Sequence, residues 1–562
     1  MLAQKPNVVL IVTDDQGYGE IAAHGNPYIK TPEMDKLYNT GVRFDNFHVN
    51  AVCSPSRAAL MTGKYASSVG VWNTTGGRNI LDIKAKIVPQ YFKEAGYQTA
   101  LIGKWHLGDG YPYRPEDRGF DEVFRIGAGS LGQVADYWGN GLWNGHYYNG
   151  SQWEPTNGFS TDVQFDKGIA FIEKHKRQPF FLTLATTAPH APIGADDKYV
   201  VPYLKMGLTS SVAKFYGMVT NIDANIAKLR NKLEACGLTE NTILVFMSDN
   251  GSANDKKGNS FNGGMRGKKG SLYEGGHRVP CFLYWPKGGW VGGKQLNQLT
   301  AHIDILPTLL HACKLHRNAK KDSKTDFDGI ALNSYIKVPS KPLHRYLITE
   351  SKVKKRKIPF ESSAVLYDQW RLVKGNELYD LQKDAKQTEN CDKEYPEVKA
   401  SLRQHYKEWF AEVSHQFDAY MPCEINSSKT ILYSMDLYKG EMTFPKSKAV
   451  WNQKSVLNGT QFRGFWKLNC TQKGYYKFRL CRWPERLPYH LGNGPKNAKY
   501  LNIVKAEVSL DGIKTSKLLN GTEKEAVFVM DIPEGVHTLQ ANFINHKEDI
   551  FSAYYVYIEK VL

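Results

Sequence analysis

The sequence has no apolar run that approaches the ~20 residues needed to cross a bilayer. None of its 8 cysteines forms a CxxC pair, which disfavours a structural zinc site or a thioredoxin-type redox motif. Zinc-finger spacing, RNP-like runs and a basic region leading into heptads are also missing. These absences argue against a membrane-spanning enzyme and against a nucleic-acid-binding protein. One disulfide, such as Cys470 with Cys481, stays open.

The charge balance is basic, with 73 Lys and Arg against 56 Asp and Glu and a net charge of +17. Such a field attracts polyanions and raises encounter rates. A sulfated polysaccharide fits this field, and simple solubility explains the charge equally well. Composition therefore leaves the partner open.

The length of 562 residues predicts more than one domain, because single cores stop growing at roughly 250–300 residues. Residues 1–340 alternate continuous apolar runs with helical stretches, which predicts an α/β catalytic domain with a mostly parallel sheet flanked by helices. Residues 341–415 fit a smaller α+β subdomain. Residues 416–562 alternate apolar and polar side chains with period two, which predicts a β-sandwich-like accessory domain with a structural packing role.

Polar residues follow four of the apolar runs. They are Asp14 and Asp15 after NVVLIVT, Lys104 and His106 after TALI, His190 after FFLTLA, and Asp249 and Asn250 after TILVFM. Asp or Asn at a single strand end is usually only part of a turn. In open α/β sheets, however, ligands bind outside the carboxyl ends of the strands. Four such ends together predict a shared site.

A fifth segment adds a cysteine, in the run Cys53-Ser54-Pro55-Ser56-Arg57. Pro55 suits the first turn of a helix, so Cys53 would lie at the positive end of that helix with Arg57 one turn further on. A lone cysteine is most often a small buried hydrophobe. The surrounding run changes that interpretation.

The run CSPSRAALMTG at residues 53–63 resembles a signature of the type I sulfatases, and GYQTALIGKWH at residues 96–106 resembles a second one. The resemblance extends from Asn7 to about Val413. It implies the fold of the alkaline phosphatase superfamily and a sulfuric ester hydrolase, with bacterial arylsulfatases and glycan sulfatases as the most similar group. It also implies a periplasmic or secreted protein, although no signal peptide is visible.

The resemblance further implies that Cys53 is oxidised to formylglycine by a formylglycine-generating, sulfatase-maturing enzyme. One hydroxyl of the aldehyde hydrate would attack sulfur, and the other would then expel sulfate. This covalent route splits one hard displacement into two easier steps. The substrate it implies is a sulfated carbohydrate.

Metal ligands are expected at Asp14, Asp15, Asp249 and Asn250, together with the modified residue 53. These hard oxygen donors suit Ca²⁺, which takes ~6–8 oxygen ligands, and Mg²⁺ is the alternative. Zinc is disfavoured because the oxygen-donor group includes no histidine or cysteine.

By the family's pattern, Arg57, Lys104 and Lys269 bind the sulfate oxygens, where a transition state needs cations. Lys268 is the neighbouring rival of Lys269 and a candidate substrate-binding residue. His106 matches the position that helps the hydrate lose its proton. His190 matches the general acid that protonates the leaving alcohol.

An aromatic insert between the second and third apolar runs includes Trp138 and Trp143, which are candidates for stacking on a sugar; loop packing is an equal interpretation. Two alternatives to a sulfatase stay open. One is a phosphodiesterase or phosphonate monoester hydrolase of the same superfamily. The other is a non-catalytic glycan-binding protein in which Cys53 is unmodified.

Overall fold

The computed structural model describes residues 5–254, 260–315, 327–352, 359–439 and 449–561. Its largest sheet contains, in chain order, β1 (Asn7–Thr13), β2 (Val42–Phe44), β4 (Gln98–Gly103), β5 (Glu122–Arg125), β6 (His146–Asn149), β7 (Gln152–Pro155), β8 (Phe180–Ala185), β9 (Thr242–Ser248), β10 (Cys281–Tyr284) and β11 (Lys294–Leu296). The spatial order is β11-β2-β10-β9-β1-β8-β4-β5-β6-β7. The central strands β9, β1, β8, β4 and β5 are parallel, and antiparallel pairs lie outside them.

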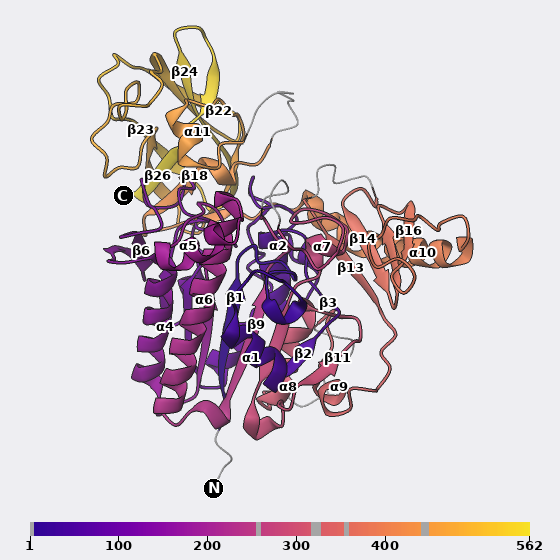
Figure 1. Ribbon diagram of the computed structural model, residues 1–562. Coiled ribbons are helices and arrows are strands. Elements are labelled where there is room, and N and C mark those ends of the chain that lie inside the picture. Colours follow the sequence, from indigo (N-terminus) through magenta and orange to yellow (C-terminus); the bar gives the residue numbers. More distant parts are fainter. Residues whose placement is uncertain (1–4, 255–259, 316–326, 353–358, 440–448, 562) are drawn as a thin grey trace.

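Helices cover both faces of this sheet, because its central strands are apolar on both sides. Val8, Leu10 and Val12 of β1 belong to one core, and Val9 and Ile11 belong to the other. The first core includes side chains of α2 (Cys53–Thr62), α3 (Val88–Glu94) and α8 (Ile305–Ala312). The second includes α1 (Pro32–Thr40), α4 (Ser160–His175), α5 (Asp197–Lys205) and α6 (Ser210–Ala235). Figure 1 shows α4 and α6 standing side by side along the sheet.

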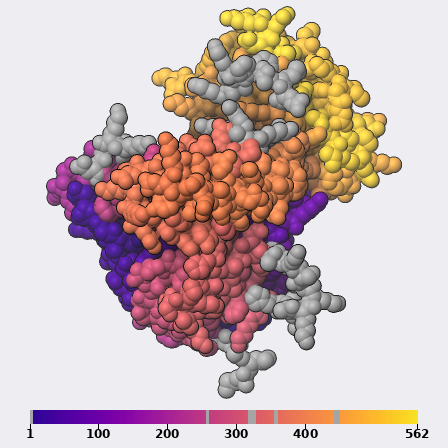
Figure 2. All heavy atoms as spheres, turned by 90° about the vertical axis from the view of Figure 1, so that its right-hand side faces the viewer, coloured from indigo at the N-terminus to yellow at the C-terminus, as the bar shows by residue number. Residues whose placement is uncertain are grey.

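A small subdomain follows, with the antiparallel strands β13 (Tyr346–Glu350), β14 (Ser363–Tyr367), β15 (Trp370–Val373) and β16 (Glu377–Asp380). Helix α10 (Pro396–Val413) packs its apolar stripe on them. Shorter elements elsewhere are β3 (Phe47–His48), α7 (Glu274–His277), β12 (Thr300–Ala301), α9 (Asn333–Lys337) and α11 (Gln453–Leu457). Figure 2 shows the small subdomain facing the viewer, with the C-terminal region above it.

The C-terminal region contains two further sheets. One has β17 (Cys423–Ile425), β19 (Trp466–Cys470), β21 (Ile503–Leu510), β22 (Ile513–Leu518), β24 (Gly535–Asn545) and β25 (Ile550–Ser552). The other has β18 (Thr430–Tyr433), β20 (Gly474–Cys481), β23 (Glu525–Ile532) and β26 (Tyr555–Lys560). Their inward-facing side chains share one core, as the period-two alternation predicts.

The disulfide left open by the sequence is not formed. Cys470 ends β19 in one sheet and Cys481 ends β20 in the other, and all the cysteines are free thiols. Asp511 and Gly512 form the turn that joins β21 and β22 into a hairpin. Among the described residues, no helix combines the length and the apolarity needed to cross a membrane.

The register of the central strands determines where their ends lie. Thr13, the last residue of β1, pairs with Ser248 at the end of β9, and Val12 pairs with Ala185 at the end of β8. Gly103 at the end of β4 also pairs with Ala185. All four predicted strand ends therefore meet at one edge of the sheet.

Candidate active site

A buried cluster of carboxylates lies at this edge. Asp14 and Asp15 follow β1, Asp249 follows β9, and their oxygens lie within 4.8 Å of one another and of the Cys53 sulfur. The backbone N–H of Asp15 donates to Asp249 Oδ1 at 3.2 Å. Asp15 has φ 75°, a left-handed conformation that non-glycine residues rarely adopt outside special sites.

Cys53 faces this cluster from the first position of α2. The preceding Val52 is extended, and its side chain makes no capping hydrogen bond to the helix. Cys53 Sγ is 3.6 Å from Asp14 Oδ1 and 3.9 Å from Asp15 Oδ1. Burial raises the pKa of the thiol to about 12, although Lys104 and Lys269 oppose the shift. An unmodified Cys53 therefore remains a protonated thiol at neutral pH and is a weak nucleophile.

Three cationic side chains pair with the three carboxylates. Arg57 donates through Nε to Asp249 Oδ2 at 2.9 Å, and its Nη2 is 2.8 Å from the same oxygen. Lys104 Nζ is 2.8 Å from Asp14 Oδ2, and both side chains are fully buried. Lys269 Nζ is 2.5 Å from Asp15 Oδ1 and 3.4 Å from Cys53 Sγ. The cluster thus has a cation on each side of the sulfur atom.

The charges within the cluster hold Asp14 and Lys269 ionised. Burial alone would raise the pKa of Asp14, but Lys104, His190, Arg57 and Lys269 lower it well below its usual range. Burial would likewise lower the pKa of Lys269, but Asp15 raises it above its ordinary value. Asp14 is therefore a carboxylate and Lys269 an ammonium at neutral pH.

His106 is a neutral base of defined tautomer. Burial, with Lys104 and Arg57 nearby, lowers its pKa well below the usual value. Its Nε2 lies 3.1 Å from the carbonyl oxygen of Thr74, which can only accept, so the proton is on Nε2. Its Nδ1 is buried and has no hydrogen-bond partner. That nitrogen therefore has a free lone pair.

His190 lies on the other side of the cluster and is partly exposed. Its Nδ1 donates to the carbonyl oxygen of Ala191 at 2.7 Å, and its Nε2 lies 3.7 Å from Asp15 Oδ2. When His190 is protonated, it has a proton on Nε2 as well as on Nδ1, and Nε2 faces Asp15. The geometry is suitable for proton donation toward the centre.

The cluster has the donor chemistry of a hard divalent cation. Asn250 donates through Nδ2 to Asp15 Oδ1 at 2.8 Å, while its Oδ1 is buried with no hydrogen-bond partner. A buried amide oxygen without a donor is costly unless something positive lies against it. With three carboxylates alongside, these residues form an acidic cluster that could hold a metal ion.

The candidate substrate-binding residues separate in space. Lys268 donates to the carbonyl oxygen of Asn254 at 3.1 Å, whereas Lys269 contacts the cluster. The Trp138 ring centroid is 5.1 Å from that of Trp483, inside the C-terminal core. Trp143 is 46% exposed and donates through Nε1 to Asp196 at 3.2 Å. Trp138 is therefore partly buried against the C-terminal core, whereas Trp143 is exposed.

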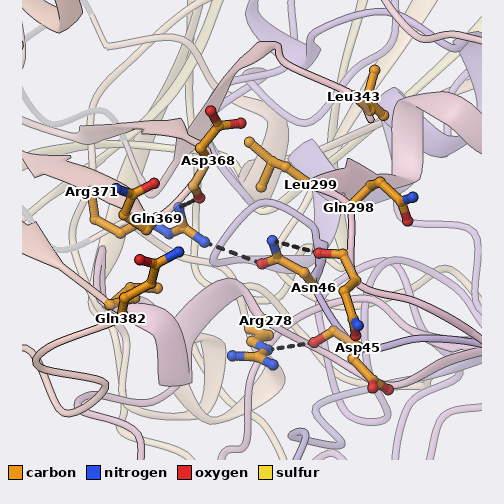
Figure 3. Close-up of a pocket in the computed structure, with 12 residues that line it drawn as sticks. Asp45, Asn46, Arg278, Gln298, Leu299, Leu343, Asp368, Gln369, Arg371 and Gln382 are labelled. Carbon is orange, nitrogen blue, oxygen red and sulfur yellow. Dashed lines mark hydrogen bonds between the residues drawn. The ribbon is translucent and has the colours of Figure 1, made fainter. Parts of the chain in front are cut away.

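A second polar site joins the main domain to the small subdomain. Glu274 pairs with Arg371 at 2.7 Å, and Arg371 also donates to Asn46 Oδ1 at 3.1 Å. His48 and His277 approach each other at 2.9 Å beside Glu274. A cavity of about 380 Å³ lies here, and Figure 3 shows Asn46 and Arg371 among the residues that line it. None of its lining residues is a predicted catalytic residue.

Residues that the sequence did not single out complete the site. The carbonyl oxygen of Thr74 accepts a hydrogen bond from the Nε2–H group of His106. Gly129 lies against the His106 ring, where an added Cβ atom would overlap three ring atoms. Glu20 accepts from Gly17 N at 2.5 Å and from the Ser252 hydroxyl, and so ties together the loops after β1 and β9. No local pattern marks these residues, because each contact is made by a loop.

Comparison with known proteins agrees with this geometry. The family model described as Sulfatase matches residues 6–315. The N-acetylgalactosamine-6-sulfatase of Rattus norvegicus is 32% identical over 354 residues, which cover 58% of this chain and 65% of that protein. The N-acetylgalactosamine-6-O-sulfatase of Bacteroides thetaiotaomicron is 28% identical over 481 residues, covering 71% and 92%.

Solved structures also match. The crystal structure of Ps i-CgsB in complex with k-i-k-neocarrahexaose has a TM-score of 0.64 and 26% identity, covering 74% of this chain and 95% of that one. The chain spans just under two thirds of the length of the mammalian relatives it matches, between 62% and 66%. The expected alkaline phosphatase-like fold is confirmed, and the chain belongs to the sulfatase family.

Proposed function

We propose that the protein hydrolyses sulfate esters of carbohydrates at the cluster around Cys53. The observation that carries this proposal is the position of the Cys53 sulfur. It lies 3.6 Å from Asp14 and 3.4 Å from the Lys269 ammonium, at the start of α2. An oxygen nucleophile at this position would have both a metal site and a cation beside it.

Two groups complete the centre in this proposal. Formylglycine made from Cys53 by a maturing enzyme supplies an aldehyde hydrate as nucleophile, and Ca²⁺, with Mg²⁺ as the alternative, supplies positive charge to the sulfate. The protonated state of the Cys53 thiol supports the conversion of Cys53 to formylglycine, because an unmodified, protonated thiol would be a poor nucleophile toward the sulfate ester. Asp14, Asp15, Asp249, Asn250 and residue 53 would hold the ion, and their hard oxygens favour calcium.

The cationic side chains bind and orient the sulfate group. Arg57, Lys104 and Lys269 approach the centre from three elements and are held in place by the carboxylates they pair with. Cations fixed in advance in a buried site stabilise developing negative charge without reorganisation at the moment of reaction. This preorganisation is the main catalytic contribution we assign to the chain.

Two histidines move protons. His106 receives a proton at Nδ1, because its Nε2–H is held by Thr74. His190 gives a proton from Nε2 to the leaving alcohol, and its distance of 3.7 Å from Asp15 places it at the edge of the same centre. General acid–base catalysis of this kind contributes about 100- to 10,000-fold.

The substrate class follows from the relatives and from the insert. N-acetylgalactosamine-6-sulfatases and a carrageenan-oligosaccharide complex are among the matches, so a sulfated sugar is the substrate we propose. The Trp143 ring packs on Gly194, four residues after His190, and offers its exposed face to a sugar on the leaving-group side. We also propose that the protein works in the periplasm or outside the cell, as sulfatases that degrade external glycans do.

The same proposal includes the domain boundaries. The hydrophobic cores support a catalytic domain over 1–340, a small subdomain over 341–415 and a β domain over 416–562, although Leu347, Leu366 and Val373 of the small subdomain also join the core of the catalytic domain. Glu274 and Arg371 link the first two.

Parallel assays test the activity. The protein, produced with a maturing enzyme and Ca²⁺, is given an aryl sulfate, an aryl phosphate, a phosphodiester and a panel of sulfated oligosaccharides. We expect turnover of the sulfate esters, with the highest kcat/KM on one sulfated sugar. Faster hydrolysis of the phosphodiester than of every sulfate ester would favour the phosphodiesterase alternative and contradict the proposal.

A further inference from the structure

His106 is held by two loops, one at the Nε2 edge of its ring and one against the ring itself. One loop supplies the Thr74 carbonyl oxygen, which accepts the hydrogen bond from the Nε2–H group of His106. The other places Gly129 against the ring so closely that no side chain would fit. The orientation and tautomer of His106 therefore depend on where these loops lie, and neither belongs to the sheet.

The C-terminal β domain fixes the Thr74 loop. Two residues beyond Thr74, the N–H of Gly76 donates to the carbonyl oxygen of Met435 at 2.7 Å. The next residue, Gly77, has φ 70° and lies directly on the Tyr438 ring. Met435 and Tyr438 both follow β18 of the C-terminal region. A shift of that segment would move the carbonyl that sets the His106 tautomer.

The same domain fixes the Gly129 loop, mainly through Gln453. The buried Gln453 amide donates to the carbonyl oxygens of Gln133 and Tyr137, each at 3.0 Å, and accepts from Gly139 N at 2.9 Å. The Gln133 side chain in turn accepts from Gly129 N at 2.8 Å. One side chain thus connects the C-terminal domain to the residue against the His106 ring.

Backbone and aromatic contacts reinforce this attachment. Val134 N donates to the Trp451 carbonyl oxygen at 3.1 Å, and the Tyr555 hydroxyl donates to the Val134 carbonyl oxygen at 3.0 Å. Val134 and Ala135 are members of the C-terminal hydrophobic core. Figure 1 shows the C-terminal sheets lying above the main sheet. The loop is consequently packed as a part of the β domain.

We propose that the C-terminal β domain is a positioning element of the active centre, and that Gln453 is the residue through which it holds His106. Only the expected change in kcat rests on the proposed function. It requires that both loops keep Nε2 protonated and Nδ1 directed at the reacting group. Gln453 is a positioning residue, since it acts through Gln133 and Gly129.

The test compares two variants in the full chain. Gln453→Ala removes the amide that holds the loop. Arg482→Gln is the matched control, because Arg482 is buried in the same domain and donates only to carbonyls within it, those of Val456, Leu457, Leu491, Gly492 and Lys499. Thermal unfolding of both variants records how much each destabilises the domain.

Two readouts separate positioning from stability. The first is the pair of NMR chemical shifts of the His106 ring nitrogens, measured in protein that contains isotope-labelled histidine. The His106→Gln variant assigns these signals. This measurement needs no substrate, so its outcome does not depend on the proposed activity. The second is kcat and KM on an aryl sulfate. Misplaced catalytic groups cost about 10- to 100-fold in kcat.

For Gln453→Ala we expect mixed His106 tautomers and a kcat lowered about 10- to 100-fold, with KM within about twofold. For Arg482→Gln we expect the wild-type tautomer and kcat despite a lower Tm. Unchanged His106 shifts in Gln453→Ala, or an equal loss of kcat in Arg482→Gln, would overturn the proposal.

Discussion

Neighbouring lysines give the sharpest test of the cation arrangement. Lys269 Nζ is 2.5 Å from Asp15 and 3.4 Å from the sulfur of residue 53, whereas Lys268 Nζ is directed at the carbonyl oxygen of Asn254. We expect Lys269→Met to lower kcat on an aryl sulfate by about 100- to 1,000-fold, the effect of removing one preorganised transition-state partner. That is about 2.7–4 kcal/mol of barrier.

Lys268→Met is the matched control, since it removes the same charge one residue away. Its effect on kcat should stay within about twofold, as for surface substitutions away from special features. Both variants are assayed with saturating Ca²⁺ and with the extent of residue 53 conversion measured by mass, so that neither metal loss nor incomplete maturation is mistaken for lost catalysis. A comparable loss in Lys268→Met, or wild-type kcat in Lys269→Met, would refute this account of the site.

Three further predictions concern the metal, the substrate and pH. Removal of the metal by a chelator should abolish activity and lower Tm, and Ca²⁺ at 100 times its Kd should restore about 2.7 kcal/mol of stability. A Tm that does not change with the Ca²⁺ concentration would contradict the proposed metal site. Trp143→Ala should raise KM on a sulfated sugar and spare a small aryl sulfate, while Trp138→Ala should lower Tm instead; equal effects on both substrates would count against a sugar platform at Trp143. Burial raises the pKa of Glu350 from 4.5 to about 7, so its native state binds the proton more tightly than the unfolded chain. The stability this gives is complete below about pH 4.5 and is lost as pH rises through about 7, in total about 3 kcal/mol. Glu350→Gln should make the midpoint of urea unfolding less dependent on pH between about pH 5 and pH 8. An unchanged dependence of the midpoint on pH would contradict the assignment to Glu350.

Much of the fold follows from local patterns in the sequence. The run at Asn7–Thr13 predicts β1 with its observed bounds, because a strand buried on both faces is continuously apolar. The α+β subdomain expected over residues 341–415 contains α10, which begins at Pro396 and has a clear apolar stripe. Strand ends that share an edge of a parallel sheet bring Asp14, Lys104 and Asp249 together without further information.

Contacts between distant segments could not be predicted in this way. Trp138 and Trp143 lie in the same insert, yet one packs on Trp483 and the other is open to solvent, because the C-terminal domain covers only the first. Thr74 and Gly129 are unremarkable in sequence. Their importance depends on contacts with residues more than 300 positions further along the chain, such as Met435 and Gln453.

The central claim is that residue 53, once oxidised, provides the attacking oxygen inside a ring of cations. The most direct measurement pairs the mass of the peptide containing residue 53 with the rate of sulfate release, across preparations made with increasing amounts of maturing enzyme. The account predicts that the rate rises in proportion to the fraction of Cys53 converted to formylglycine and vanishes in Cys53→Ala. Sulfate release that is undiminished in fully unconverted protein would contradict it.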